Sequence, residues 1–129
     1  NLPGHTASET AVYVPEERVV FTGDNLNLKI PIFIKSRPYA WLESLKYLQQ
    51  LDADYYVPGH GDVSGKDCIQ PMSDAVREWI DLVKSAHAQG LSLEQTLDRV
   101  ALEQNPQNDP WLANVIRLSI NDLFHLLKP

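Results

Sequence analysis

The tripeptide Pro-Gly-His occurs twice in this chain of 129 residues, and it contains two of the four histidines, His5 and His60. Asp24 also follows a glycine, in the string Phe-Thr-Gly-Asp. Each of these three side chains follows or ends a run of residues with β-strand propensity, and the preceding glycine lets the backbone turn sharply there. Side chains at neighbouring strand ends of one sheet can converge on a common point.

Two imidazoles and a carboxylate form a ligand set that suits a cation such as zinc, iron or manganese. The two oxygens of Asp24 could bridge two ions, and each imidazole needs an acceptor for its second ring N–H. In the simpler alternative, His5 and His60 are ordinary turn residues and Asp24 caps a loop. The repeated tripeptide and the shared setting favour the metal site, with His5, Asp24 and His60 as ligands.

Other residues that could carry chemistry are weaker candidates. His87 and His125 lie in predicted helices and match no motif, so we expect structural roles for both. Cys68 has no base motif nearby and is expected to behave as a small apolar group. Ser64 lies in the string Val-Ser-Gly-Lys, which lacks the upstream glycines of a phosphate-binding loop.

Short strands must position the candidate ligands. Residues 10–14 and 19–24 are β-rich runs around a four-residue turn, which predicts a hairpin. Residues 54–57 predict a third strand that Pro58 ends. The segment 25–38 contains two prolines and predicts an extended loop with a short edge strand. We expect substrate contacts in this loop because it follows the candidate aspartate directly.

The rest of the chain is predicted to be helical. Apolar residues at helical spacing predict four helices, over residues 39–51, 71–89, 92–102 and 111–127. Ser92 and Gln95 match a capping box, and Asp109 before Pro110 is a favourable helix start. The three tryptophans fall on apolar helical faces, so we expect core packing for Trp41, Trp79 and Trp111.

Composition excludes several classes of function. The net charge is −6 and the Lys and Arg residues do not cluster, which disfavours binding to nucleic acid or to an anionic membrane. No apolar run approaches the length of a membrane span. With one cysteine in the chain, an internal disulfide framework does not exist.

The strings Leu-Pro-Gly-His-Thr, Val-Phe-Thr-Gly-Asp and Tyr-Val-Pro-Gly-His-Gly-Asp-Val together resemble the second half of the metallo-β-lactamase superfamily. The resemblance covers about the first ninety residues and is closer to the broad hydrolase and glyoxalase-II-like branches than to the antibiotic-destroying enzymes. It implies that His5 binds a first metal, that Asp24 bridges two metals and that His60 binds the second. The implied cofactor is zinc, two ions per full-length protein, with iron or manganese as alternatives.

The resemblance also implies an α/β fold, namely half of a four-layer αββα sandwich with short mixed or antiparallel strands followed by C-terminal helices. Residues 1–65 would be the C-terminal half of the core with its ligand loops, and residues 66–129 a helical segment. The family's His-x-His-x-Asp-His motif does not occur in this chain. We therefore expect a C-terminal fragment that is inactive by itself, with the water-activating aspartate in the other half and no catalytic residue here.

For the full-length protein the resemblance implies a metal-dependent hydrolase of small molecules with ester, thioester or lactone-type bonds. A di-iron oxidoreductase on the same fold and a non-catalytic partner or assembly module are the alternatives. Half a sandwich would leave a sheet face and a sheet edge uncovered, so we expect a homodimer or higher self-association. A cytoplasmic location is the default, because a chain that starts within a motif does not report on targeting.

Overall fold

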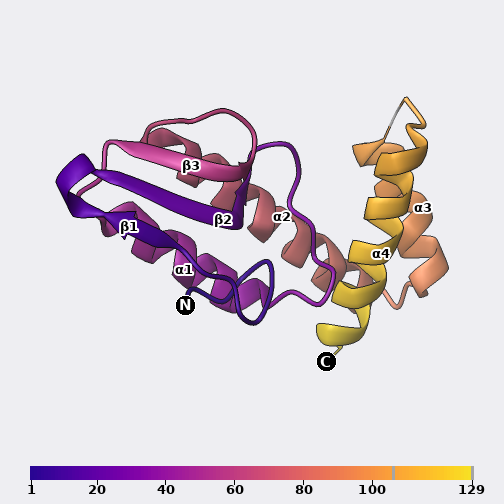
Figure 1. Ribbon diagram of the computed structural model, residues 1–129. Coiled ribbons are helices and arrows are strands. Elements are labelled where there is room, and N and C mark those ends of the chain that lie inside the picture. Colours follow the sequence, from indigo (N-terminus) through magenta and orange to yellow (C-terminus); the bar gives the residue numbers. More distant parts are fainter. Residues whose placement is uncertain (106, 129) are drawn as a thin grey trace. The chain divides into compact units, whose positions relative to one another are not determined.

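The computed structural model describes residues 1–105 and 107–128 and has an α/β fold of short strands and helices (Figure 1). The elements in chain order are β1 (Val12–Val14), η1 (Pro15–Glu17), β2 (Val19–Asn27), α1 (Pro38–Gln50), β3 (Tyr55–His60), η2 (Lys66–Cys68), α2 (Ile69–Ala88), α3 (Leu93–Gln104) and α4 (Pro110–Leu126). The chain divides into two compact units, which are described separately. Unit 1 contains Asn1–Pro31 and Lys35–Arg77, and unit 2 contains Ile32–Ile34 and Glu78–Pro129.

Unit 1 contains a three-stranded mixed sheet in the order β1-β2-β3. β1 and β2 form the predicted antiparallel hairpin, in which Val14 pairs with Val19. The four-residue turn consists of η1 and Arg18, which takes up a left-handed conformation with φ of 53°. β3 runs parallel to β2, and α1 makes the crossover connection between these two strands.

Two strands extend beyond the predicted ends. β2 continues to Asn27, and β3 passes through Pro58 to His60, so the prediction that Pro58 ends the strand is wrong. Within the described sheet β3 lies at an edge, where the missing N–H of a proline is tolerated. β1 is shorter than predicted. In the segment 25–38, residues 25–27 belong to the central strand β2 and residues 28–37 contain no strand, so the expected edge strand there is also wrong.

The core of unit 1 lies between the sheet and α1. Val20 on β2 and Tyr56 on β3 are completely buried, as are Trp41, Leu45 and Leu48 at helical spacing on α1. The Tyr56 hydroxyl donates to the Leu48 carbonyl oxygen at 2.8 Å, which ties β3 to the last turn of the helix. This core holds the strands in place, and two of the candidate ligands lie on them, Asp24 within β2 and His60 at the end of β3.

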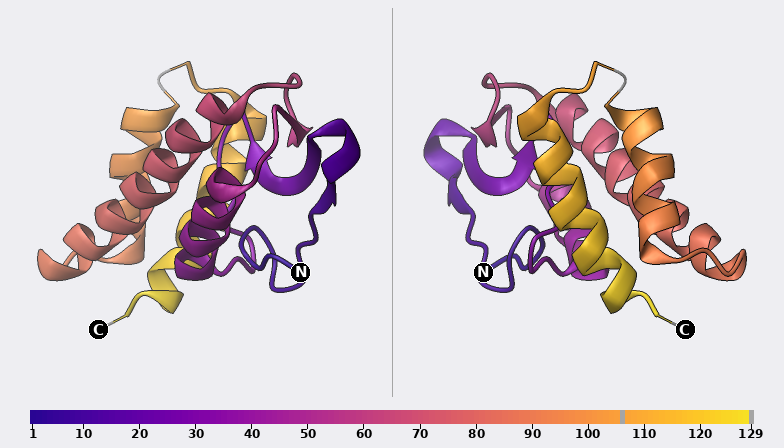
Figure 2. Two further views of the ribbon diagram at one scale, coloured as in Figure 1. Left: turned by 90° about the vertical axis from the view of Figure 1, so that its left-hand side faces the viewer. Right: turned by 90° about the vertical axis from the view of Figure 1, so that its right-hand side faces the viewer.

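Unit 2 is helical, and α3 and α4 pack against each other while running in opposite directions (Figure 2). Ser92 and Gln95 form the predicted capping box at the start of α3. The Asp109 carboxylate accepts a hydrogen bond from the Leu112 N–H at 2.7 Å, as its predicted capping role requires. His87 makes a 2.8 Å hydrogen bond to the Phe124 carbonyl oxygen, which is a structural contact.

The positions of some helical residues differ from the expectation. Trp41 and Trp79 are buried as predicted, but Trp111 is 59% exposed, so its predicted core role is wrong. The buried face of α4 begins one turn later, at Val115. Helical spacing identifies a face, but it does not show where along the helix a packing partner begins. α2 begins two residues before Pro71, which the first turn of a helix tolerates.

Within residues 1–105 and 107–128, no helix is both long enough and apolar enough to cross a membrane.

Candidate metal centre

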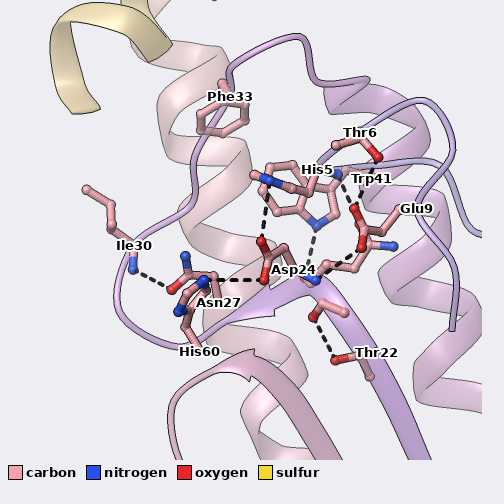
Figure 3. A network of polar contacts seen from close by, with 12 residues as sticks. His5, Thr6, Glu9, Thr22, Asp24, Asn27, Ile30, Phe33, Trp41 and His60 are labelled. Atoms are coloured by element: carbon pink, nitrogen blue, oxygen red, sulfur yellow. Dashed lines mark hydrogen bonds and ion pairs between the residues drawn. The ribbon is translucent and has the colours of Figure 1, made fainter. Parts of the chain in front are cut away.

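The structure brings His5, Asp24 and His60 together in unit 1 (Figure 3). The Nε2 atom of His5 lies 3.6 Å from Oδ2 of Asp24, and the Nε2 atom of His60 lies 3.5 Å from Oδ1. Each carboxylate oxygen therefore faces a different imidazole. The side chain of His5 is 16% exposed, that of Asp24 34% and that of His60 54%, so the cluster is open on the His60 side.

The three side chains come from three kinds of local structure. His60 is the last residue of β3, as the strand-end expectation requires, and His5 lies in the irregular segment before β1. Asp24 lies inside β2, so its predicted place at a strand end is wrong. The pairing of β2 with β3 shifts register on both sides of Gly23, which has a φ of 56°. This irregularity, and not the end of the strand, re-aims the aspartate.

Two of the three glycines before the candidate ligands serve a purpose other than the predicted sharp turns. Among these three glycines, Gly23 alone has a positive φ. A Cβ atom at Gly59 would collide with Oδ1 of Asp24, and one at Gly4 would collide with Oδ1 of Asn25. Gly4 and Gly59 are therefore needed for the close approach of neighbouring side chains and not for backbone conformation.

Two polar residues near the ligands carry contacts that motif reasoning missed. Asn25 is completely buried, and its Oδ1 atom accepts a 3.0 Å hydrogen bond from the His5 backbone N–H. Glu9 accepts a 3.3 Å hydrogen bond from the Asp24 backbone N–H. The one sequence signal for Asn25 is a polar residue directly after the aspartate in a β-rich run, and Glu9 carries no signal at all.

Trp41 on α1 contacts the backbone of Asn25 and the imidazole of His5. Its indole Nε1 donates to the Asn25 carbonyl oxygen at 3.0 Å. Its ring meets the His5 imidazole edge-on, with the ring centroids 5.8 Å apart. Trp41 is completely buried, so the His5 imidazole packs against a side chain that belongs to the core.

A cavity of about 220 Å³ lies between the loop after β2 and the start of α2. Its walls include Asn27, Lys29, Met72 and Cys68. Asn27 is paired with His60 in the sheet, so the cavity wall adjoins a candidate ligand through the backbone. Burial, and secondarily the nearby Asp67, raises the pKa of the Cys68 thiol, which fits a protonated wall residue and not a nucleophile.

The donor set fits a zinc-type ion chemically, since two imidazole nitrogens and two carboxylate oxygens are common zinc ligands. However, no group of three or more His, Cys, Asp or Glu side chains in residues 1–105 and 107–128 is arranged to hold a metal ion. The cluster consists instead of two His–carboxylate contacts that share Asp24. A complete site would need either further ligands or a small rearrangement of these three side chains.

A sequence model of the Metallo-beta-lactamase superfamily matches residues 1–60. The chain is 29% identical over 124 residues to the Beta-lactamase-like protein 2 homolog of Caenorhabditis elegans. The alignment covers 91% of this chain and 39% of that protein. It is 30% identical over 84 residues to the Metallo-beta-lactamase type 2 of Bacteroides fragilis, covering 60% of this chain and 34% of that protein. The chain thus spans little more than a third of the length of either relative.

The fold is also similar to that of solved metallo-β-lactamases. The mono-zinc form of FIM-1 from Pseudomonas aeruginosa superposes with a TM-score of 0.52 at 21% identity, over 59% of this chain and 37% of that chain. This likeness concerns the fold alone. The family match spans His5, Asp24 and His60. Residues 1–60 therefore match the metallo-β-lactamase superfamily in sequence, and the chain resembles solved metallo-β-lactamases in fold.

Proposed function

We propose that His5, Asp24 and His60 are ligands of a dinuclear zinc centre in a longer metal-dependent hydrolase. The observation that carries the proposal is the arrangement around Asp24, in which Oδ2 faces His5 and Oδ1 faces His60. One carboxylate with an imidazole at each oxygen is suited to contacting two ions, one on each side. In this proposal residues 1–65 supply half of the sandwich core and residues 66–129 a helical segment.

Bound zinc would lower the pKa of a water molecule to about 7 and polarise the carbonyl oxygen of an ester, thioester or lactone-type substrate. The residues of this chain would hold and orient the centre. The His5 side chain is 16% exposed and packs edge-on against the buried Trp41 ring. His60 is more than half exposed and leaves its side of the cluster open to solvent, where a substrate could approach. The names of the relatives, one a metallo-β-lactamase and one a mono-zinc form, support zinc and hydrolysis.

The ligand assignment is tested by titrating the metal-free chain with zinc chloride. The imidazole resonances of His5 and His60 are expected to shift, while those of His87 and His125 stay unchanged. Binding is expected to be weak, because the cluster is not arranged as a complete site. If this chain alone kept two zinc ions per molecule after dialysis, the expectation of weak binding would be wrong.

Substitution of the shared carboxylate gives the sharper test. Asp24→Ala is expected to lower the zinc affinity at least tenfold, as loss of a ligand requires. Asp81→Ala is the matched control, because it removes one exposed carboxylate from α2. Equal zinc affinity for Asp24→Ala and the unsubstituted chain would refute the assignment.

The metal content of the longer protein separates the functional alternatives. Zinc with hydrolase activity supports the proposal. A redox-active iron pair would favour an oxidoreductase on this fold, and a protein without bound metal would favour a non-catalytic assembly module.

A further inference from the structure

We infer that Asn25 and Glu9 are positioning residues that clamp the His5 and Asp24 segments together. The clamp is reciprocal. Asn25, the residue after Asp24, accepts a hydrogen bond from the backbone N–H of His5. Glu9, four residues after His5, accepts one from the backbone N–H of Asp24 (Figure 3). The inference rests on the proposed function in one respect, namely that the two clamped residues are metal ligands.

The Asn25 arm uses both ends of a buried side-chain amide. Oδ1 accepts from the His5 N–H at 3.0 Å, and Nδ2 donates to the Leu2 carbonyl oxygen at 2.7 Å. The residue is completely buried, so neither group can turn to water instead. Gly4 leaves the room for this contact, since a Cβ there would collide with Oδ1 of Asn25. The loop from Leu2 to His5 is thereby fixed against β2.

The Glu9 arm uses both oxygens of a half-buried carboxylate. One oxygen accepts from the Asp24 N–H at 3.3 Å, and the other accepts from the Thr6 hydroxyl at 3.1 Å. Gly23 leaves the room here, because a Cβ at that position would collide with Oε1 of Glu9. Glu9 therefore joins the residue after His5 to the irregular part of β2 that carries Asp24.

The segment that carries His5 is also tied to Arg37, whose N–H donates to the Gly4 carbonyl oxygen at 2.7 Å, and to Ser44 on α1, whose hydroxyl donates to the Pro3 carbonyl oxygen at 2.7 Å. Asn25 and Glu9 tie it to β2. Residues 1–11 contain neither helix nor strand, and His5 and Asp24 belong to segments that do not pair as strands. Asn25 and Glu9 thus join the two backbones that carry His5 and Asp24, whose Nε2 and Oδ2 atoms lie 3.6 Å apart. Partners that orient ligands in this way commonly change metal affinity by about 10- to 100-fold when removed.

Substitutions at Glu9 separate the clamp from a general effect of charge. Glu9→Ala removes both hydrogen bonds, whereas Glu9→Gln keeps an oxygen for the Asp24 N–H and can donate its amide to the Thr6 hydroxyl. Glu16→Ala is the matched control, because it removes one exposed carboxylate from η1. Each variant is titrated with zinc chloride, and amide hydrogen exchange is measured on the metal-free chain.

Glu9→Ala is expected to weaken zinc binding at least tenfold and to speed exchange of the Asp24 amide more than that of the Val20 amide in the sheet core. Glu9→Gln and Glu16→Ala are expected to stay within about threefold of the unsubstituted chain in both measurements. Thr6→Ala, which removes only the hydroxyl that orients Glu9, is expected to give a smaller loss in the same direction. It keeps the test decisive if Glu9→Ala does not fold.

Asn25→Ala tests the other arm and is expected to speed exchange of the His5 amide selectively. Unchanged exchange of both clamped amides, or equal losses in Glu9→Ala and Glu9→Gln, would overturn the clamp. If the unsubstituted chain binds no zinc, the proposed function fails while the exchange measurements on the metal-free chain still decide the clamp.

Discussion

Gly59→Ala should disturb the candidate metal centre by steric overlap alone. An ideal Cβ at Gly59 would collide with Oδ1 of Asp24 and would lie 2.9 Å from the backbone carbonyl carbon of Gly23, about half an ångström inside ordinary contact. Strand spacing is fixed by ladder hydrogen bonds at about 4.8 Å, so the backbone cannot yield freely. Overpacking of this kind costs about 1–3 kcal/mol. The free energy of unfolding, measured in urea, should fall by that amount.

The same substitution should move the Asp24 carboxylate away from His60, which the imidazole resonances of His60 report. Gly90→Ala is the matched control because it introduces backbone strain without steric overlap. The φ of Gly90 is 69°, and no atom lies within 4 Å of the added Cβ. It should cost about 1–2 kcal/mol through backbone strain and leave the imidazole resonances unchanged. Full stability of Gly59→Ala with unchanged His60 resonances would refute the steric explanation.

Two further predictions concern the sheet. The Arg18 guanidinium, which pairs with Asp54 at 2.7 Å, lowers the pKa of that carboxyl below its ordinary value of 3.8. The pair therefore stabilises the fold above pH 4, and this contribution is lost as the pH falls through the lowered pKa. The free energy of urea unfolding between pH 2 and 6 should depend less on pH in Asp54→Asn than in the unsubstituted chain. The same pH dependence in both chains would contradict the pairing. Self-association stays a prediction, for which one sheet face offers Val12, Phe21 and Tyr55, exposed at 55%, 48% and 56%. Light scattering should show species above 14.6 kDa that Phe21→Lys reduces, whereas a concentration-independent monomer mass would refute it.

Local signals in the sequence predicted most of the helices and the hairpin. The capping box of Ser92 and Gln95 and the Asp109 cap formed as expected, because their hydrogen bonds connect residues within one turn. The hairpin formed because its strands are neighbours in the chain. The doubled Pro-Gly-His motif and Gly-Asp also identified the three side chains that the structure brings together.

Features that depend on distant residues were decided by the tertiary structure. The reach of β3 through Pro58 depends on its position at the sheet edge, and the exposure of Trp111 depends on where the neighbours of α4 begin. Periodicity contains neither kind of information. Both follow from contacts between segments that are far apart in the chain.

The candidate site shows the same division most clearly. The sequence by itself determined which candidate ligand side chains are present, since side-chain chemistry is local. The tertiary structure decided that Gly59 provides space for Asp24 and that Asn25 and Glu9 accept hydrogen bonds from the backbones of His5 and Asp24. These roles exist only once β2, β3 and the His5 loop are packed together, because steric room and hydrogen-bond partners are properties of the assembled neighbours and not of any one residue.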